Sequence, residues 1–228
     1  MREATRVVRA GLPDGRQGEP FLPGPTFASP YHLAGDPSTS AYSYGRYHNP
    51  NWTHFERALS DLEGGMALVF SSGMAATTAV LSVALSPGNV VVMPSDGYYT
   101  ARMLAEGYFA SHGIEVRTAS TAGNAQRAQL AGATLLWLET PSNPGLDVCD
   151  LTELITAAHR LGVLVAVDNT TATLLGQQPL AQGADFSVSS DTKVLTGHSE
   201  VPHGQRPGAS TGIAPYSSCL LYTSDAAD

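Results

Sequence analysis

Hydrophobic and polar positions along the chain predict helices that alternate with buried strands. Apolar residues recur at helical spacing after Thr53, which forms a capping box with Glu56, until Gly64 ends the run. Continuous apolar runs predict strands at 67–70, 90–93, 114–116, 135–138 and 163–167, and the pattern between them predicts helices at 75–85 and 151–161. Such strands are typical of sheets buried on both faces, so this order predicts an α/β fold with a largely parallel sheet covered by helices.

Polar residues that follow these strands are the candidates for chemistry, because ligands of such sheets bind beyond the carboxyl ends of the strands. Asp168 closes one strand, and Lys193 follows a short strand at 186–188. A partly desolvated lysine amine can form a Schiff base, and a carboxylate facing a pyridine nitrogen is what pyridoxal phosphate requires to act as an electron sink. Each residue has an ordinary alternative, since a lysine after a strand is usually solvated and an aspartate there usually caps a turn or helix.

The junction at residues 71–74 is a third candidate. Its small residues allow backbone N–H groups at a helix start to approach a phosphate, and Ser190 and Thr192 offer hydroxyls to the same anion. A tight turn capped by serine is the alternative. The chain has no Walker loop and this junction has no GxGxxG, so a dinucleotide site is not expected.

Composition disfavours several classes of function. The 228 residues include 12 basic and 20 acidic side chains, and the net charge of -8 argues against partners such as nucleic acid or anionic membranes. No apolar run approaches the roughly 18 residues of a membrane span, and no apolar signal core follows Met1, so a cytoplasmic location is expected. Cys149 and Cys219 lack ligand spacing, so no metal site is expected.

The two ends of the chain differ from its middle. Residues 1–52 are rich in aromatic residues and proline without regular periodicity, which predicts an ordered arm packed on its own body or on a neighbouring subunit. A surface loop is the alternative. From residue 202 the pattern of helices and strands stops, and no structure is assigned to residues 202–228.

Ordered motifs between about residues 21 and 201 carry a resemblance to a known family. They are Tyr44-Gly45-Arg46, Asn49-Pro50, Ser72-Gly73-Met74-Ala75, Glu139-Thr140-Pro141-Ser142-Asn143-Pro144, Val167-Asp168-Asn169-Thr170, and Ser190-Asp191-Thr192-Lys193 with Thr196-Gly197-His198-Ser199 after it. They resemble the pyridoxal-phosphate (PLP) enzymes of Cys/Met metabolism, the cystathionine gamma-lyase and gamma-synthase group. The resemblance implies the type I fold of PLP-dependent transferases, similar to aspartate aminotransferase.

The resemblance also implies a division of the chain. Residues 1–52 would be an arm that contacts a neighbouring subunit, and residues 53–201 would be an incomplete PLP-binding large domain. The C-terminal small domain of the family would be missing. Residues 202–228 would be an aberrant tail from a shifted reading frame or from sequencing adapter.

Residue roles follow from the same resemblance. Lys193 would hold the cofactor as a Schiff base and move protons between substrate carbons, with Asp168 paired to the pyridine nitrogen. Tyr98 would act in catalysis by stacking on the cofactor ring, although Tyr99 is an alternative and either tyrosine can simply pack in the core. Asn143 would bond the phenolic oxygen of the cofactor.

The phosphate would be held by backbone and hydroxyl donors, namely those of Gly73, Met74, Ser190 and Thr192. Tyr44 and Arg46 would reach the phosphate of a neighbouring subunit. The resemblance therefore implies a homo-oligomer, a dimer at least and usually a tetramer in the family.

The implied activity is that of a PLP-dependent carbon–sulfur lyase. Cystathionine gamma-lyase is preferred, with cystathionine as the amino-acid substrate and cysteine, 2-oxobutanoate and ammonia as products. Cystathionine gamma-synthase or a related homoserine-ester sulfhydrylase is the alternative, because it uses the same early steps and cofactor groups. A noncatalytic PLP-binding fragment is an alternative of another class, since the domain that binds the substrate carboxylate would be absent.

Overall fold

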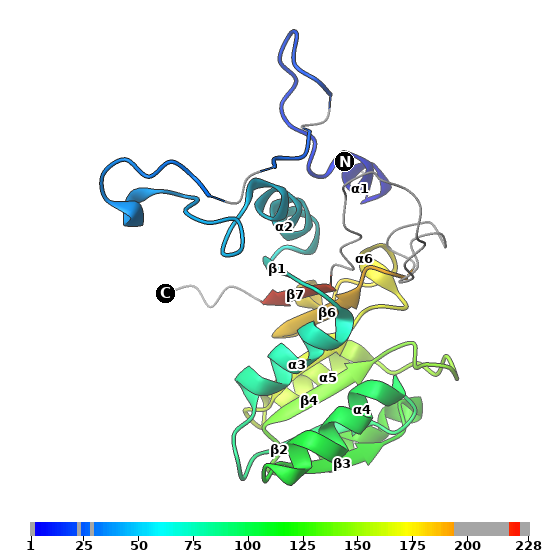
Figure 1. Ribbon diagram of the computed structural model, residues 1–228. Helices are drawn as coiled ribbons and strands as arrows, with labels where there is room; N and C mark the ends of the chain where they lie inside the picture. Colours follow the sequence, from blue (N-terminus) through cyan, green and yellow to red (C-terminus); the bar gives the residue numbers. More distant parts are fainter. Residues whose placement is uncertain (1–2, 22–23, 28–29, 194–218, 224–228) are drawn as a thin grey trace, which may run out of the picture. The chain divides into compact units, whose positions relative to one another are not determined.

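The computed structural model describes residues 3–21, 24–27, 30–193 and 219–223 and is shown in Figure 1. The chain divides into two compact units, residues 1–62 and 63–228. All strands of the sheet belong to the second unit. In the part of the chain that the structure describes, no helix is long and apolar enough to cross a membrane.

The first unit contains α1 (Glu3–Arg9), the 3-10 helix η1 (Pro37–Thr39) and α2 (Pro50–Glu63), whose last residue lies at the unit boundary. Helix α2 begins at Pro50, so the predicted start at the Thr53 capping box was wrong. The Asn49 side chain caps the helix, because its Oδ1 accepts the Trp52 N–H at 3.1 Å. Pro50 fills the first helical position, where a missing N–H breaks no helical hydrogen bond.

The second unit is a seven-stranded sheet with helices around it. Its strands are β1 (Met66–Phe70), β2 (Val90–Pro94), β3 (Glu115–Ala119), β4 (Leu135–Glu139), β5 (Leu164–Asp168), β6 (Phe186–Ser190) and β7 (Cys219–Thr223). Its helices are α3 (Gly73–Ala84), α4 (Tyr99–Leu104), the π-helix η2 (Ala105–Phe109), the 3-10 helix η3 (Ala122–Gln129), α5 (Leu151–His159), α6 (Thr173–Gly176) and the 3-10 helix η4 (Leu180–Gln182).

The strand order is β1-β7-β6-β5-β4-β2-β3, and the expected largely parallel α/β sheet is confirmed. Strands β3, β2, β4, β5 and β6 pair in parallel. Strand β7 lies between β1 and β6 and runs antiparallel to both. This strand falls in the region after residue 201 to which the sequence pattern assigned no structure, because one isolated apolar run there carries no helical or strand context.

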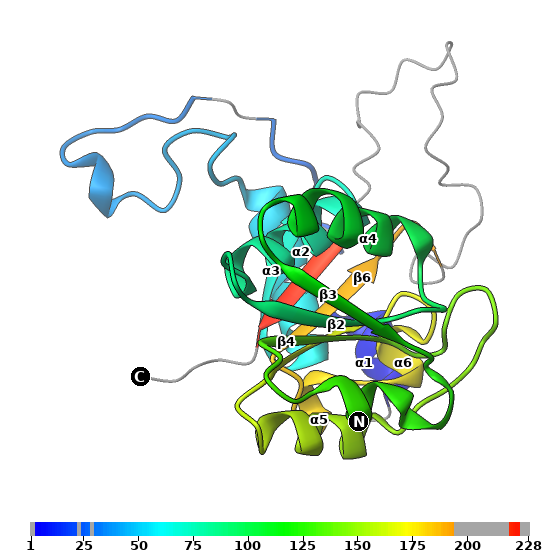
Figure 2. The same cartoon turned by 90° about the horizontal axis from the view of Figure 1, so that it is seen from below.

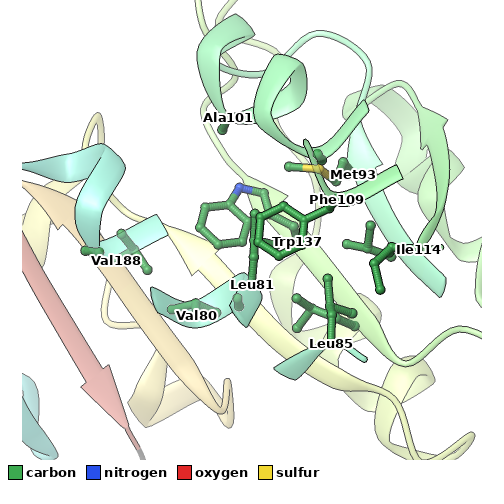
Figure 3. Packing of buried hydrophobic residues seen from close by; sticks show 14 residues of the cluster. Val80, Leu81, Leu85, Met93, Ala101, Phe109, Ile114, Trp137 and Val188 are labelled. Carbon is green, nitrogen blue, oxygen red and sulfur yellow. The ribbon is translucent and has the colours of Figure 1, made fainter. Parts of the chain in front are cut away.

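Helices cover both faces of the sheet. Figure 2 shows α3 and α4 on one side of β2 and β4, with α5 on the other side. Alternate residues of a strand point to opposite faces, so Trp137 packs with Leu81 of α3 while Leu136 and Leu138 pack with Leu154 of α5. Figure 3 shows the first cluster, in which Trp137 and Leu81 are fully buried.

Three further parts of this unit differ from the sequence expectations. One is β1, which was expected to be buried on both faces although its Leu68 is 43% exposed. Strand β3 was expected to be buried on both faces, but it is the edge strand and its residues are exposed or half-buried. Helix α4 and the π-helix that continues it were not predicted. Tyr99, Met103 and Tyr108 are exposed apolar residues on this segment, and they obscure the helical periodicity of the sequence.

Candidate active site

A cavity of about 260 Å³ opens at the carboxyl ends of the strands. Residues that follow or close β1, β2, β4, β5 and β6 line it, namely Ser72, Gly73, Met74, Thr77, Tyr98, Glu139, Asn143, Asp168, Thr170, Thr171, Val188, Ser190, Thr192 and Lys193. The parallel sheet brings these distant segments together, as the position of ligand sites in such sheets predicts. All the lining residues belong to the second unit.

Asp168 is the last residue of β5 and lies at the base of this cavity, 9% exposed. Burial raises the pKa of its carboxyl, and hydrogen bonds from the Thr170 side chain and backbone oppose that change. The Thr170 hydroxyl donates to Oδ1 at 2.6 Å and the Thr170 N–H donates to the same oxygen at 3.1 Å. A cation placed against the other oxygen would favour the charged form of this acid.

Thr170 also joins Asp168 to the neighbouring strand. Its Oγ1 accepts the Ser190 N–H at 2.9 Å while its own proton goes to Asp168. Ser190 and Thr192 in turn lie 3.0 Å apart through their hydroxyl oxygens. One hydroxyl therefore fixes the spacing between the buried acid and the segment that leads to Lys193.

Helix α3 begins at the cavity wall. Ser72 is its N-cap, and the Ser72 Oγ accepts the Ala75 N–H at 3.1 Å. The first N–H groups of a helix have no partner within the helix, so Gly73 and Met74 present donors and the positive end of the helix dipole to the cavity. The start of α3, whose N–H groups can donate to an anion, thus lines the same cavity as the hydroxyl-bearing residues Ser190 and Thr192.

Tyr98 lines the cavity, whereas Tyr99 does not. The two rings meet edge to face with centroids 5.5 Å apart, and Tyr99 is the more exposed at 61% against 37%. Of the two tyrosines left open by the sequence, the structure therefore brings Tyr98 to the other cavity residues. Asn143 also lines the cavity, with an exposed side chain.

Lys193 is the last residue of the described segment and lies at the cavity wall. In the part of the chain that the structure describes, its side chain is exposed and thus lacks the partial desolvation that was expected of a lysine that forms a Schiff base. Its backbone N–H donates to the Ser190 carbonyl oxygen at 3.2 Å, which closes a turn directly after β6. The lysine, the buried aspartate and the helix start nevertheless share one cavity.

Glu139 is a cavity residue to which the sequence reasoning gave no role. It closes β4, is 5% exposed, and its pKa is raised to about 8 by burial and by the negative charge of Asp168. The hydrogen bond from the Tyr98 backbone partly opposes this change. The sequence held the same signal as for Asp168, an acidic residue at the end of a fully apolar run.

Tyr44 and Arg46 lie in the first unit and contact each other. The Arg46 guanidinium donates to the Tyr44 hydroxyl at 2.6 Å and lies 4.9 Å from the centre of the Tyr44 ring. The described cavity does not include either side chain.

The donor set of the cavity fits the groups of PLP. Lys193 offers an amine for an aldehyde, Asp168 a buried carboxylate for a protonated pyridine nitrogen, and the start of α3 offers N–H groups to a phosphate. The ring of Tyr98 offers a stacking face.

Comparisons with known proteins identify the family of the chain. Residues 5–206 match the family model for Cys/Met metabolism PLP-dependent enzymes. A candidate cystathionine gamma-lyase of Streptomyces coelicolor is 55% identical over 215 residues, which cover 92% of this chain and 54% of that protein. The chain therefore spans about half the length of the curated relatives it matches.

Solved structures show the same likeness. A cystathionine gamma-lyase of Micromonospora echinospora superposes with a TM-score of 0.83 at 34% identity, covering 99% of this chain and 56% of that one. A cystathionine gamma-synthase of Xanthomonas oryzae pv. oryzae in complex with cystathionine gives a TM-score of 0.83 at 31% identity, covering 99% and 55%. The expected type I fold is thereby confirmed, and the chain belongs to the Cys/Met metabolism PLP-dependent enzymes.

Proposed function

We propose that the protein is a PLP-dependent carbon–sulfur lyase that acts as a cystathionine gamma-lyase. It would convert cystathionine and water to cysteine, 2-oxobutanoate and ammonia. The observation that carries the proposal is the meeting of Lys193 and buried Asp168 with the start of α3 in one cavity. The identity to the Streptomyces coelicolor protein supports the choice of reaction.

Bound PLP supplies an electron sink that stabilises negative charge on the substrate carbons. Lys193 would hold the cofactor through its Nζ and, once released by the substrate, would carry protons at the same atom. Asp168 would stay ionised against the pyridine nitrogen, because a nearby positive charge offsets the cost of its burial. Thr170 would keep the carboxylate aimed, since it holds Oδ1 through two hydrogen bonds.

The phosphate would lie at the start of α3. Backbone N–H groups of Gly73 and Met74 and the hydroxyls of Ser190 and Thr192 would hold it, because all four line the cavity. Asn143 would bond the phenolic oxygen, and Tyr98 would stack on the ring.

Cystathionine gamma-synthase is the second candidate function. The structural likeness to the Xanthomonas enzyme in complex with cystathionine favours it as much as the lyase, because the two reactions need the same lysine, acid and phosphate groups. Two further candidates are a homoserine-ester sulfhydrylase and a noncatalytic PLP-binding fragment. The fragment is a candidate because the chain spans about half the length of its relatives.

The first experiment is the visible absorption spectrum of the full chain after addition of PLP, beside Lys193→Ala. A band of lysine-bound PLP that is lost in the variant supports the proposed site. Soluble, folded protein without such a band would refute it. Thr152→Ala, a change on α5 outside the cavity, serves as the matched control.

A second set of assays separates the reactions. Release of 2-oxobutanoate from cystathionine supports the lyase, whereas formation of cystathionine from an activated homoserine and cysteine supports the synthase. Formation of a homoserine-derived thiol product from sulfide supports the sulfhydrylase. A lysine-bound spectrum with none of these activities supports the noncatalytic fragment.

The proposal includes a homo-oligomer and a cytoplasmic location. Tyr44 and Arg46 form a cation-bearing pair in the first unit, and a guanidinium is a strong hydrogen-bond partner for phosphate, so the pair suits a role at the phosphate of a neighbouring subunit. Mixing Arg46→Ala chains with Lys193→Ala chains tests this role. Mixed oligomers should recover some of the lysine-bound spectrum that neither variant gives alone, and no recovery would contradict the shared site.

A further inference from the structure

We propose that Glu139 is a positioning residue that fixes Tyr98 at the cavity by accepting the Tyr98 backbone N–H. The proposal rests on the proposed function only for the role of Tyr98 against the cofactor. The contact itself is a property of the chain alone. The two residues are far apart in the sequence. Glu139 closes β4, whereas Tyr98 immediately precedes α4.

The hydrogen bond is short and buried at its acceptor. The Tyr98 N–H donates to Glu139 Oε2 at 2.6 Å, and Glu139 is 5% exposed. Tyr98 is the N-cap of α4, and its side chain makes no capping hydrogen bond. The carboxyl of a neighbouring strand therefore accepts the N–H of the N-cap residue, the donor that a Glu or Gln within the helix serves in a capping box.

Gly97 shows how closely the turn approaches Glu139. A Cβ added at position 97 would lie 2.7 Å from Glu139 Oε2 and 2.6 Å from Pro94 Cγ. Real Cβ atoms do not approach other atoms this closely, so only glycine allows the turn to lie against the carboxyl. The absence of a side chain at this position is an independent sign that the turn is fitted to Glu139.

Asp96 holds the same turn from the other side. Its Oδ1 accepts the Thr121 N–H at 3.0 Å and the Thr121 hydroxyl at 2.9 Å. The turn is thus tied to the segment after β3 through Asp96 and to β4 through Glu139. With both ties in place the backbone direction at Tyr98 is set, and its ring is directed to the cavity that it lines.

The protonation state of Glu139 is compatible with its position beside Asp168. The two residues are register partners on adjacent strands β4 and β5. Burial and the nearby Asp168 and Asp96 raise the Glu139 pKa to about 8, so the carboxyl is largely protonated at neutral pH. A neutral Glu139 can hold Tyr98 without adding a second negative charge beside the carboxylate assigned to the pyridine nitrogen.

Amide hydrogen exchange of the full chain without cofactor tests the contact directly. Exchange at Tyr98 should become about tenfold faster or more in Glu139→Ala and should stay within about threefold of the original in Glu139→Gln, whose amide oxygen still accepts the bond. Glu106→Gln, an exposed carboxyl in the following π-helix, is the matched control. Unchanged exchange at Tyr98 in Glu139→Ala would overturn the proposal.

Gly97→Ala provides a second route if Glu139→Ala does not fold. The added methyl group lies too close to the Glu139 carboxyl and to Pro94, so the turn and the carboxyl move apart. Tyr98 exchange should again be faster by about tenfold, while exchange in β4 and β5 is unchanged. Equal exchange at Tyr98 in this variant and the original chain would refute a role of Glu139 in holding the turn.

Titration with PLP tests whether Glu139 acts through Tyr98. Tyr98→Ala and Glu139→Ala should each raise the Kd of PLP, and the double variant should match Tyr98→Ala within about twofold. Multiplicative losses would mean that Glu139 acts on the site by another route. An original chain that binds no PLP, but whose Tyr98 exchange still depends on Glu139, would refute the proposed function and leave this inference standing.

Discussion

Replacing Glu139 by glutamine should make the stability of the chain less sensitive to pH. The pKa of Glu139 is about 8 in the folded chain and 4.5 for an unperturbed glutamate. The folded state therefore holds a proton that the unfolded state has lost between these two values. Stability from this group is fully present below pH 4.5 and is lost as the pH rises to about 8.

The magnitude follows from the width of that interval. Each pH unit between the two pKa values lowers the free energy of unfolding by about 1.4 kcal/mol, so the loss between pH 5 and pH 8 is on the order of 4 kcal/mol. Glutamine has no proton to lose and keeps an oxygen for the Tyr98 N–H. Its stability relative to the original chain should thus increase with pH by that amount.

Urea unfolding of the chain without cofactor, at several pH values from 5 to 8.5, measures this difference. The raised pKa of Glu63 acts in both proteins and in the same direction, so its effect cancels in the comparison. Asp168 interacts with Glu139, so the difference reports Glu139 together with its effect on Asp168. Glu106→Gln, a change of the same type at an exposed position, is the control. A constant difference between Glu139→Gln and the original chain at pH 5 and pH 8.5 would refute the assignment of a raised pKa.

Three other substitutions test the fold and the site. Asn49→Ala should lower the free energy of unfolding by about 1 kcal/mol through loss of the α2 cap, while Thr53→Ala should cost less, as thermal unfolding of both can show. Leu81→Ala, in the core of Figure 3, should cost about 2–5 kcal/mol in urea unfolding, and a smaller loss would mean that the core closes around the gap. Thr170→Val should weaken PLP binding by about tenfold, because Asp168 loses a hydroxyl donor; an unchanged Kd in a PLP titration would show that the hydroxyl does not orient Asp168.

Much of the second unit could be predicted from the sequence because its strands are continuous apolar runs. The run at β2 contains no polar residue and the run at β4 contains none until Glu139, and the structure buries every position of both strands. Helix α2 shows the limit of local patterns. Two capping signals lie close together in the sequence. The helix begins at the Asn49-Pro50 pair and not at the Thr53 capping box, where it was expected to begin.

The same distinction applies to the site, where single residues could be predicted but contacts between distant segments could not. Asp168 and Lys193 could be predicted because a single acid or amine at the end of an apolar run can be recognised from the sequence alone. Both residues line the cavity. The link between Glu139 and Tyr98 could not be predicted, since it depends on how β2 and β4 lie side by side and on the turn that Gly97 permits. The raised pKa of Glu139 likewise arises only when the sheet places it next to Asp168.

The position of β7 between β1 and β6 determines the order in which parts of the sheet can form during synthesis. Among the described strands β1 pairs only with β7, from which it is separated by about 150 residues of chain. A ribosome adding roughly 5–20 residues per second needs about 8–30 s to supply that partner. During this interval β1 has none of the described strands to join, so its edge of the sheet is completed after β2, β3, β4, β5 and β6. Strands β5 and β6, which lead to Asp168 and Lys193, can pair with each other before β7 is made, so the strands that carry these two cavity residues can pair before the sheet is complete.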